Sequence, residues 1–361
     1  MPSSIPGLQL AAEFYRDLVA PIADAIKHSA ALVGEGSEVL GFDSERSTDH
    51  SWGPRLCLFV DQDDVDRLRA ALDRQLPDDY AGWPVRFYSW RTGRTEHHVQ
   101  VTTMGSWLAT EVGFDPRATI PTVAWLTTSQ QILLQATRGA VFRDDSGELT
   151  AVRNALEWFP KDVWLWLMAC QWYLIERTEP LVGRTAEAGD DLGSRLAASR
   201  LAWNAMRLCF LQERRYAPYD KWLGTAFSRL EAAVDVGHPM AAMLAAVDYP
   251  MREDGLVKML QAIAQRQNRL GLTRNVEAVA DVFDLKIDAA IRPYRVINAN
   301  RFVAACREAI ADPGLRNLKL VGSIDQLTNA TDLLINFTDW PRRLGRLYEE
   351  DLLGSSGRDL S

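Results

Sequence analysis

The spacing of apolar residues along the chain changes near residue 103. Before that point, stretches with helical spacing alternate with short apolar runs, whereas from Pro121 onward almost every apolar stretch has the spacing of a helix. The pattern predicts an α+β protein with a small α/β N-terminal domain and a large all-helical C-terminal domain. We place these domains at residues 1–120 and 121–352, followed by a flexible tail at 353–361.

The first 103 residues predict a compact α/β arrangement. Residues 8–30 have apolar residues at helical spacing, and Pro21 should divide them into two helices, the second of which ends before Gly34. The segments that follow are predicted as a strand at 56–60, a helix at 63–76, and two strands at 85–90 and 97–103 joined by a glycine-containing hairpin connection.

The remainder of the chain predicts helices separated by turns. The predicted helices cover residues 128–138, 150–158, 161–178, 190–215, 218–235, 239–247, 253–269, 274–284, 299–311 and 340–352. The segment RGAVFRDDSGEL at 138–149 has Asp and Gly where a turn favours them, so we predict a turn there.

Composition and charge argue against some classes of function. The chain has 361 residues, of which 47% are hydrophobic and 24% charged, as in ordinary globular proteins. Its net charge of -8 argues against nucleic acid as the main partner, because such binding depends on Lys and Arg side chains that neutralise phosphates. A small anion held together with a divalent metal ion is compatible with this charge.

The cysteines and the N-terminus favour a cytoplasmic protein. The four cysteines are far apart, with neither zinc-site nor disulfide spacing, so we predict buried free thiols at Cys57, Cys170, Cys209 and Cys306. The N-terminus lacks the basic start and continuous apolar core of a secretion signal. The most apolar segment, at 163–170, is far shorter than the roughly 20 residues that cross a bilayer, so we expect no membrane partner.

The stretch GSEVLGFDSERSTDHSWGPRLCLFV at 36–60 combines small residues, a Ser/Thr/Asp/His cluster and an apolar strand. A Gly-Ser loop lets the backbone approach a phosphate closely while the hydroxyl donates to it. An aspartate beside such a loop can hold a divalent cation that bridges phosphates. Ser47, Thr48 and Asp49 are also good turn and capping residues, so a purely structural role is the alternative.

Other segments of the chain, together with this stretch, carry a resemblance to a known protein family. They include FPKDVWLWLMACQW at 159–172, ERRYAPYDKWLGTAF at 213–227 and VGSIDQLTNATDLL at 321–334. The Gly-Ser loop, the further glycine and the aspartate before a strand resemble the nucleotidyltransferase superfamily, whose pattern ends in Asp-x-Asp. Over nearly the whole chain, the sequence resembles one uncharacterised bacterial family of that superfamily, the DUF4037 proteins.

The resemblance implies a nucleotidyltransferase-like N-terminal domain and a helical domain that closes over it. Carried over to this sequence, Gly36 and Ser37 would contact a nucleoside triphosphate and Asp49 would ligate Mg2+. The second metal carboxylate of the pattern falls at Ser51, and a serine hydroxyl is a poorer ligand for a hard cation. For the third carboxylate, which can act as general base, the candidate is Glu96 just before a later strand.

The helix predicted at 190–215 contains further candidates. One face has Arg200, Asn204, Arg207 and Arg214, and the opposite face has Leu192, Leu196, Trp203, Met206 and Phe210. Arg200 and Arg207 are candidates to clamp a phosphate or carboxylate, with a salt-bridged face as the alternative. Lys221, near the next helix start, is a candidate to reach the triphosphate, with a solvated lysine as the alternative.

These observations lead to one predicted function and two alternatives. We predict an enzyme that transfers a nucleoside monophosphate from a magnesium-bound nucleoside triphosphate to a small-molecule or protein acceptor. The first alternative is a catalytically silent nucleotide- or ligand-binding protein that lacks a full carboxylate set because of Ser51. The second is a scaffold whose helical half binds a partner protein. No Walker-type loop, dinucleotide fingerprint or nucleophile elbow occurs in the sequence.

Overall fold

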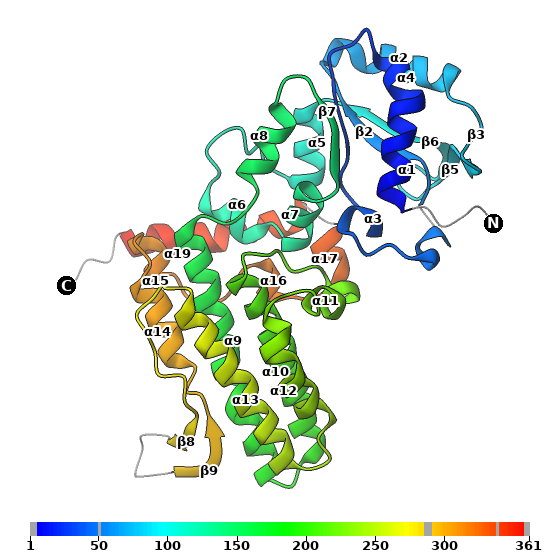
Figure 1. Cartoon of the computed structure of the whole chain (residues 1–361). Coiled ribbons are helices and arrows are strands. Elements are labelled where there is room, and N and C mark those ends of the chain that lie inside the picture. Colours follow the sequence, from blue (N-terminus) through cyan, green and yellow to red (C-terminus); the bar gives the residue numbers. More distant parts are fainter. Residues whose placement is uncertain (1–5, 50–51, 285–290, 337–338, 357–361) are drawn as a thin grey trace. The chain divides into compact units, whose positions relative to one another are not determined.

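The structure of this mixed α/β protein is a computed structural model (Figure 1). It describes residues 6–49, 52–284, 291–336 and 339–356. The chain divides into two compact units. Unit 1 contains Met1–Pro121 and Gln131–Glu157, and unit 2 contains Thr122–Gln130 and Trp158–Ser361. Among the described residues, no helix combines the length and apolar character needed to cross a bilayer.

Unit 1 is built on a five-stranded mixed sheet with the strand order β5-β6-β2-β1-β7. The strands are β1 (Ser29–Leu32), β2 (Arg55–Phe59), β5 (Arg86–Ser89), β6 (Arg94–Thr102) and β7 (Ala140–Asp144). β2 and β6 are parallel, whereas β1 is antiparallel to both β2 and β7, and β5 is antiparallel to β6. A separate short ladder pairs β3 (Asp79–Tyr80) with β4 (Trp83–Pro84).

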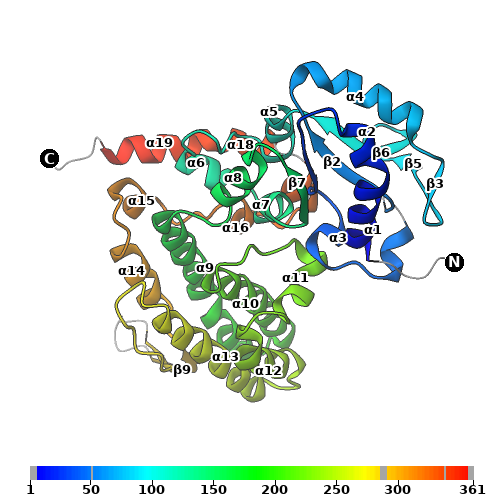
Figure 2. The same ribbon diagram turned by 45° about the horizontal axis from the view of Figure 1, so that its top comes forward.

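The helices α1 and α4 pack against one face of this sheet, and the hydrophobic core lies between these helices and the strands. The helical elements of unit 1 are α1 (Gly7–Phe14), η1 (Tyr15–Val19), α2 (Ala20–Ala23), α3 (Ser37–Leu40), η2 (Glu45–Asp49), α4 (Gln62–Gln75), α5 (Met104–Trp107), η3 (Leu108–Val112), α7 (Gln130–Thr137) and α8 (Glu148–Ala155). Figure 2 shows α1 and α4 beside β2 and β6. Leu68 and Leu72, one turn apart on α4, pack with Phe14 of α1 against Leu58 and Val99.

Unit 2 consists mainly of helices. Its elements are α6 (Thr122–Thr127), α9 (Lys161–Glu187), α10 (Asp191–Gln212), α11 (Asp220–Phe227), α12 (Ala232–Ala245), α13 (Tyr249–Arg269), β8 (Asp281–Asp284), β9 (Ile291–Val296), α14 (Asn300–Glu308), α15 (Pro313–Asn317), α16 (Ile324–Leu327), α17 (Thr331–Ile335), α18 (Asp339–Arg343) and α19 (Gly345–Ser356). α9 packs along α10, and α12 along α13. Trp166 and Trp172 of α9 are fully buried, so these tryptophans belong to the core.

The structure confirms the elements with strong local patterns and corrects others. The predicted strand at 56–60, the helix at 63–76 and the hairpin at 85–103 are present as β2, α4 and the β5–β6 pair. The predicted helix at 218–235 is interrupted, because α11 ends at Phe227 and α12 begins at Ala232.

Two further predictions about local structure are wrong, and a third is incomplete. Residues 29–32, predicted as the end of a helix, form the buried strand β1, because pairing with β2 and β7 outweighs the helix propensity of Ala30 and Ala31. The segment 138–149 contains the predicted turn, in which the Gly147 nitrogen donates to the Asp144 oxygen at 3.3 Å, but this turn follows the strand β7, and residues 131–157 belong to unit 1. Residues 281–284, predicted as helical, pair with β9 as β8.

Candidate functional site

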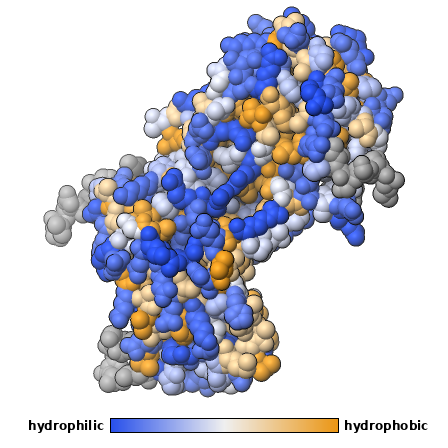
Figure 3. Space-filling view, viewed as in Figure 1, coloured by the Kyte–Doolittle hydropathy of each residue, from blue (hydrophilic) through white to orange (hydrophobic). Residues whose placement is uncertain are grey.

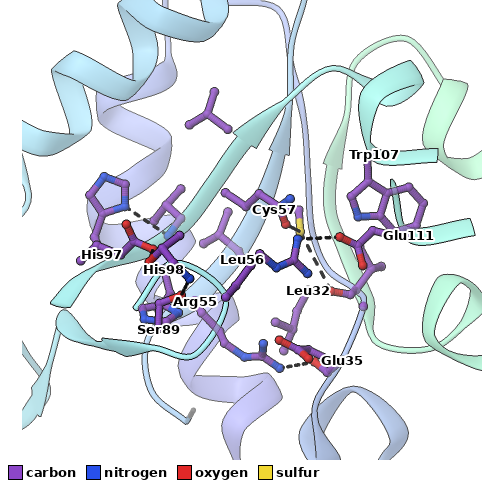
Figure 4. Close-up of a pocket in the computed structure, with 18 of the residues that line it drawn as sticks. Leu32, Glu35, Arg55, Leu56, Cys57, Ser89, His97, His98, Trp107 and Glu111 are labelled. Atoms are coloured by element: carbon purple, nitrogen blue, oxygen red, sulfur yellow. Dashed lines mark hydrogen bonds and ion pairs between the residues drawn. The ribbon is translucent and has the colours of Figure 1, made fainter. Parts of the chain in front are cut away.

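A pocket of unit 1 lies against the strands β2 and β6. Its volume is about 380 Å³, and it is lined by residues of β2, β6, α4, the β1–α3 loop, the β5–β6 connection and η3 (Figure 4). Arg55 pairs with His98 and Cys57 pairs with Gln100 across the parallel strands, so these four side chains share the pocket face. Gln100 is exposed although β6 is an interior strand, because it faces the pocket.

The predicted Gly-Ser loop borders this pocket. Gly34 and Glu35 line it, and Gly36 and Ser37 follow as the N-cap and the first residue of α3. Gly36 has a φ of 127°, a backbone conformation that L side chains rarely adopt, so this position favours glycine. Gly34 and Glu35 therefore bring main-chain groups to the pocket edge, and the phosphate contact assigned to Gly36 and Ser37 stays a prediction.

Arg55 at the start of β2 holds this loop in place. Its Nε donates to Oε1 of Glu38 at 2.6 Å, and its guanidinium also donates to the backbone oxygen of Glu35 (Figure 4). Only 13% of the Arg55 side chain and 4% of the Glu38 side chain are exposed. A Cβ atom at Gly36 would overlap the guanidinium. Arg55 therefore occupies space beside the glycine to which we assigned a phosphate.

Glu96, the predicted general base, lies in the same pocket as the loop. The hydroxyl of Thr92 donates to its carboxylate at 2.7 Å. Two residues along β6, His98 stacks on Phe87 with ring centroids 3.6 Å apart, and its Nε2 donates to the Phe87 carbonyl at 3.1 Å. Burial lowers the pKa of His98, so its imidazole is neutral at pH 7.

An ion pair connects two elements at the rim of this pocket. Arg91 in the β5–β6 connection donates to Glu111 of η3, with 2.7 Å between Nη1 and Oε1. The exposed fractions of the two side chains are 51% and 23%. The hydrogen bond from Arg91 to Glu111 raises the pKa of the guanidinium. The π-helical turn η3 places Glu111 there, and such turns are frequent at functional sites.

Sequence reasoning did not identify Arg55, Arg91 or Glu111. An arginine at the first residue of a buried strand is a signal that could have drawn attention to Arg55. Arg91 and Glu111 are separated by 20 residues and match no motif, so nothing local indicated that they would meet.

The predicted magnesium ligands are Asp49 and Ser51. Asp49 is the last residue of η2, but its side chain and the whole of Ser51 lie outside the described residues. In the part of the chain that the structure describes, no three His, Cys, Asp or Glu side chains are grouped so as to hold a metal ion. Magnesium binding stays a prediction.

The predicted phosphate-binding residues of the helical half lie in unit 2. Arg207 is buried, with its Nη2 3.1 Å from Oδ1 of Asp325 and its guanidinium over the ring of Trp203. Arg200 is exposed on the same helix. Lys221 is exposed in the first turn of α11, with its Nζ 5.1 Å from the centre of the Trp222 ring. Arg200 and Arg207 therefore occupy different environments.

The apolar and polar faces of α10 do not coincide with its buried and exposed sides. Leu192 and Leu196 are 69% and 64% exposed, whereas Asn204 and Arg207 are buried. Figure 3 shows apolar surface at the lower end of the unit 2 helices. Asn204 and Arg207 can lie in the core because both have polar partners: Gln171 donates to Asn204 at 3.0 Å, and Asp325 pairs with Arg207.

The four cysteines are buried free thiols, as predicted. Cys57 is one of the residues that line the pocket. Burial raises its pKa to about 12, so the thiol is protonated at pH 7 and is not an activated nucleophile.

The chain matches a family model over part of its length and is similar to a solved structure. No curated protein matches the chain. The chain is similar to a crystal structure described as a nucleotidyltransferase-like protein from Exiguobacterium sibiricum, with 12% sequence identity, a TM-score of 0.33, and coverage of 76% of this chain and 82% of that one. Residues 125–223 match the family model "Domain of unknown function (DUF4037)", which confirms the predicted resemblance to the DUF4037 proteins.

Proposed function

We propose that unit 1 binds a nucleoside triphosphate in the pocket beside the Gly-Ser loop, and that the protein transfers the nucleoside monophosphate to a small-molecule or protein acceptor. One observation carries this proposal: the loop residues Gly34 and Glu35 line the same pocket as Glu96, which is distant in the sequence. The segment next to the Gly-Ser pair and the candidate base therefore line one pocket.

The size and character of the pocket support a small polar ligand. Its volume of about 380 Å³ lies within the range of small-molecule sites. Arginine, glutamate, histidine and glutamine side chains surround it, and Trp90 and Trp107 add aromatic surface. Such a combination suits a ligand with a planar base and charged phosphates.

In the proposed reaction, a hydroxyl of the acceptor attacks the α-phosphorus of the nucleotide. The new bond joins the acceptor oxygen to phosphorus, the bond from the α-phosphorus to the bridging oxygen breaks, and pyrophosphate leaves with that oxygen. Glu96 takes the proton of the acceptor hydroxyl as general base. An amine acceptor would react in the same way and lose its proton after attack.

Magnesium would neutralise phosphate charge if it binds, but the described residues do not by themselves form its site. Asp49 and Ser51 stay the proposed ligands, and no step above is derived through the ion. In unit 2, Arg200 and Lys221 are exposed and stay proposed ligands of a phosphate. Arg207 already has the carboxylate of Asp325 as its partner.

Calorimetric titration with ATP, GTP, CTP and UTP, each with magnesium chloride, tests nucleotide binding. We expect at least one nucleotide to bind at millimolar concentration or below. Absence of heat from all four at millimolar concentration would overturn the proposal.

A substitution at the proposed base tests the transfer step separately. Glu96→Gln should keep nucleotide binding and lose cleavage of the nucleotide, measured as the labelled nucleoside monophosphate that an α-labelled nucleotide gives with water as the acceptor. Asp63→Asn is the matched control, because Asp63 is an exposed acid on α4 that is not one of the pocket-lining residues, and it should behave as the wild type. Equal cleavage by Glu96→Gln and the wild type would exclude Glu96 as the base.

A silent nucleotide- or ligand-binding protein is the second candidate function. The observation that favours it is the guanidinium of Arg55, which lies against Gly36 and is bonded to Glu38. The variant Ser51→Asp separates the two candidates. A silent protein should gain magnesium-dependent nucleotide binding, whereas an enzyme adapted to serine should lose turnover or gain nothing.

A further inference from the structure

Three arginines line the pocket of unit 1, and they differ in how firmly they are held. Arg55 is nearly buried in its ion pair, so it forms part of the wall. Arg69 of α4 donates to the backbone oxygen of Val101 at 3.3 Å and pairs with Asp66 at 3.0 Å. The third, Arg91, reaches the pocket from the connection between β5 and β6.

Arg91 can exchange its partner at little cost. Its carboxylate partner, Glu111, belongs to another element, and about half of the Arg91 side chain is exposed. Exposed ion pairs contribute little to stability because water screens them, whereas breaking a buried pair leaves an unpaired charge in the core. An incoming anion can therefore replace Glu111 without disturbing the fold.

We propose that Arg91 is the phosphate-binding residue of this pocket and that its guanidinium is paired with Glu111 until a nucleotide binds. The inference rests on the proposed function, because it names the residue that contacts the phosphates of the nucleotide. A guanidinium binds phosphate and carboxylate through the same pair of parallel N–H donors. The exchange therefore leaves the donors of Arg91 satisfied.

The proposed exchange predicts that substitutions of Arg91 and of Glu111 have opposite effects on nucleotide binding. Arg91→Ala removes the phosphate ligand and should weaken nucleotide binding by about 10- to 100-fold, the range expected for hydrogen bonds to charged groups. Glu111→Gln removes the competing carboxylate and one negative charge from the pocket, so it should tighten binding by about 2- to 5-fold. If the pair only held the pocket in shape, both substitutions would weaken binding.

Calorimetry with three probes tests the inference: Mg-ATP, inorganic pyrophosphate and adenosine. Arg94→Ala is the matched control, because Arg94 is an exposed arginine on the same hairpin and is not one of the pocket-lining residues. We expect Arg94→Ala to match the wild type with every probe. Arg91→Ala should weaken, and Glu111→Gln strengthen, the binding of Mg-ATP and pyrophosphate, while adenosine binding stays unchanged in both. Circular dichroism spectra of the variants confirm that each is folded.

The outcomes separate this inference from the proposed function. If the wild type binds Mg-ATP and Arg91→Ala binds it equally well, the role of Arg91 is wrong and nucleotide binding stands. If both Arg91→Ala and Glu111→Gln weaken binding, the pair is structural and the exchange is wrong. Absence of binding to both Mg-ATP and pyrophosphate by the wild type overturns the proposed function and the inference together.

Discussion

Two arginine ion pairs, one in each unit, have similar geometry and opposite surroundings. Arg207 and Asp325 in unit 2 are 3.1 Å apart, with exposed side-chain fractions of 2% and 4%. Arg91 and Glu111 in unit 1 are 2.7 Å apart, with exposed fractions of 51% and 23%. Burial, and not the distance between the charged atoms, distinguishes a pair that supports the core from a pair that can exchange for a ligand.

The comparison changes where ligand binding is expected. The helical spacing of Arg207 suggested a phosphate clamp, but the side chain is tied into the core by Asp325 and covered by Trp203. Arg91 stands in no motif, and it lies at the rim of a pocket. A basic residue with a buried partner is a poor candidate for reversible binding because losing that partner is costly.

The buried pair should respond most strongly to substitution. Asp325→Ala leaves the guanidinium of Arg207 buried without a carboxylate, and we expect a loss of about 3–5 kcal/mol in the free energy of unfolding. Urea denaturation followed by circular dichroism measures this change. A loss below about 1 kcal/mol would contradict the structural role assigned to the pair.

A double variant is the control for this prediction. Arg207→Met with Asp325→Asn removes both charges, and the asparagine oxygen can still accept the hydrogen bond from the backbone nitrogen of Gln130, which Asp325 accepts at 3.0 Å. We expect the double variant to recover most of the lost stability, because no buried charge is left without a partner.

Glu179 extends the comparison to a buried carboxylate that is held by backbone groups. It accepts hydrogen bonds from the backbone nitrogens of Ile297 at 2.8 Å and Ala299 at 2.9 Å, near the start of α14. Burial raises its pKa to about 7, and the neighbouring Glu176 adds to this while the two hydrogen bonds and Arg301 oppose it. The folded protein therefore keeps a proton that the unfolded chain loses near pH 4.5.

The free energy of unfolding should depend on pH for this reason. The contribution of Glu179 is largest below pH 4.5, falls by about 3 kcal/mol as the pH rises to about 7, and is constant above that. Urea denaturation of the wild type and of Glu179→Gln at several pH values measures it. Relative to the glutamine variant, the wild type should lose stability between pH 4.5 and 7. A difference that is constant across this range would show that Glu179 does not titrate there.

Local sequence patterns predicted the parts of the fold whose signals are local. The strand β2 and the helix α4 were found because their own apolar spacing matches their period. β1 was missed because Ala30 and Ala31 favour a helix in isolation, and the strand exists only through its pairing with β2 and β7. β7 was missed because its few residues are followed by residues typical of turns.

The difference between local signals and contacts between distant segments also applies to the candidate site. The preference for glycine at position 36 is a local property, because its φ of 127° is a conformation that L side chains rarely adopt, and the phosphate contact assigned to it stays a prediction. The meeting of Arg91 with Glu111 requires both the β5–β6 hairpin and η3 to be folded, so no spacing along the chain indicates it. Helical periodicity alone also could not decide which face of α10 is buried, because pairing with Asp325 brings Arg207 into the core.

The exposure of the Arg55–Glu38 pair lies between that of the Arg207–Asp325 pair and that of the Arg91–Glu111 pair. The variant Gly36→Ala tests how rigidly Arg55 is held. The methyl group would overlap the Arg55 guanidinium at a residue with a φ of 127°, so we expect a loss of about 1–3 kcal/mol in the free energy of unfolding. Gly41→Ala is the matched control, since Gly41 also has a positive φ of 73° but an added Cβ meets no atom within 4 Å. An equal loss in both variants would mean that Arg55 moves aside freely.

The exposed pair should contribute least to stability. Because water screens Arg91 and Glu111, Arg91→Ala should change the free energy of unfolding by only about 0–1 kcal/mol, several times less than Asp325→Ala. Urea denaturation at low and high salt measures this, and the small effect should shrink further as salt screens the charges. A loss near that of Asp325→Ala would place Arg91 among the groups that hold the fold together, and the partner exchange proposed for it would then be too costly to occur on binding. A small loss together with weaker nucleotide binding would separate the role of Arg91 in binding from any role in folding.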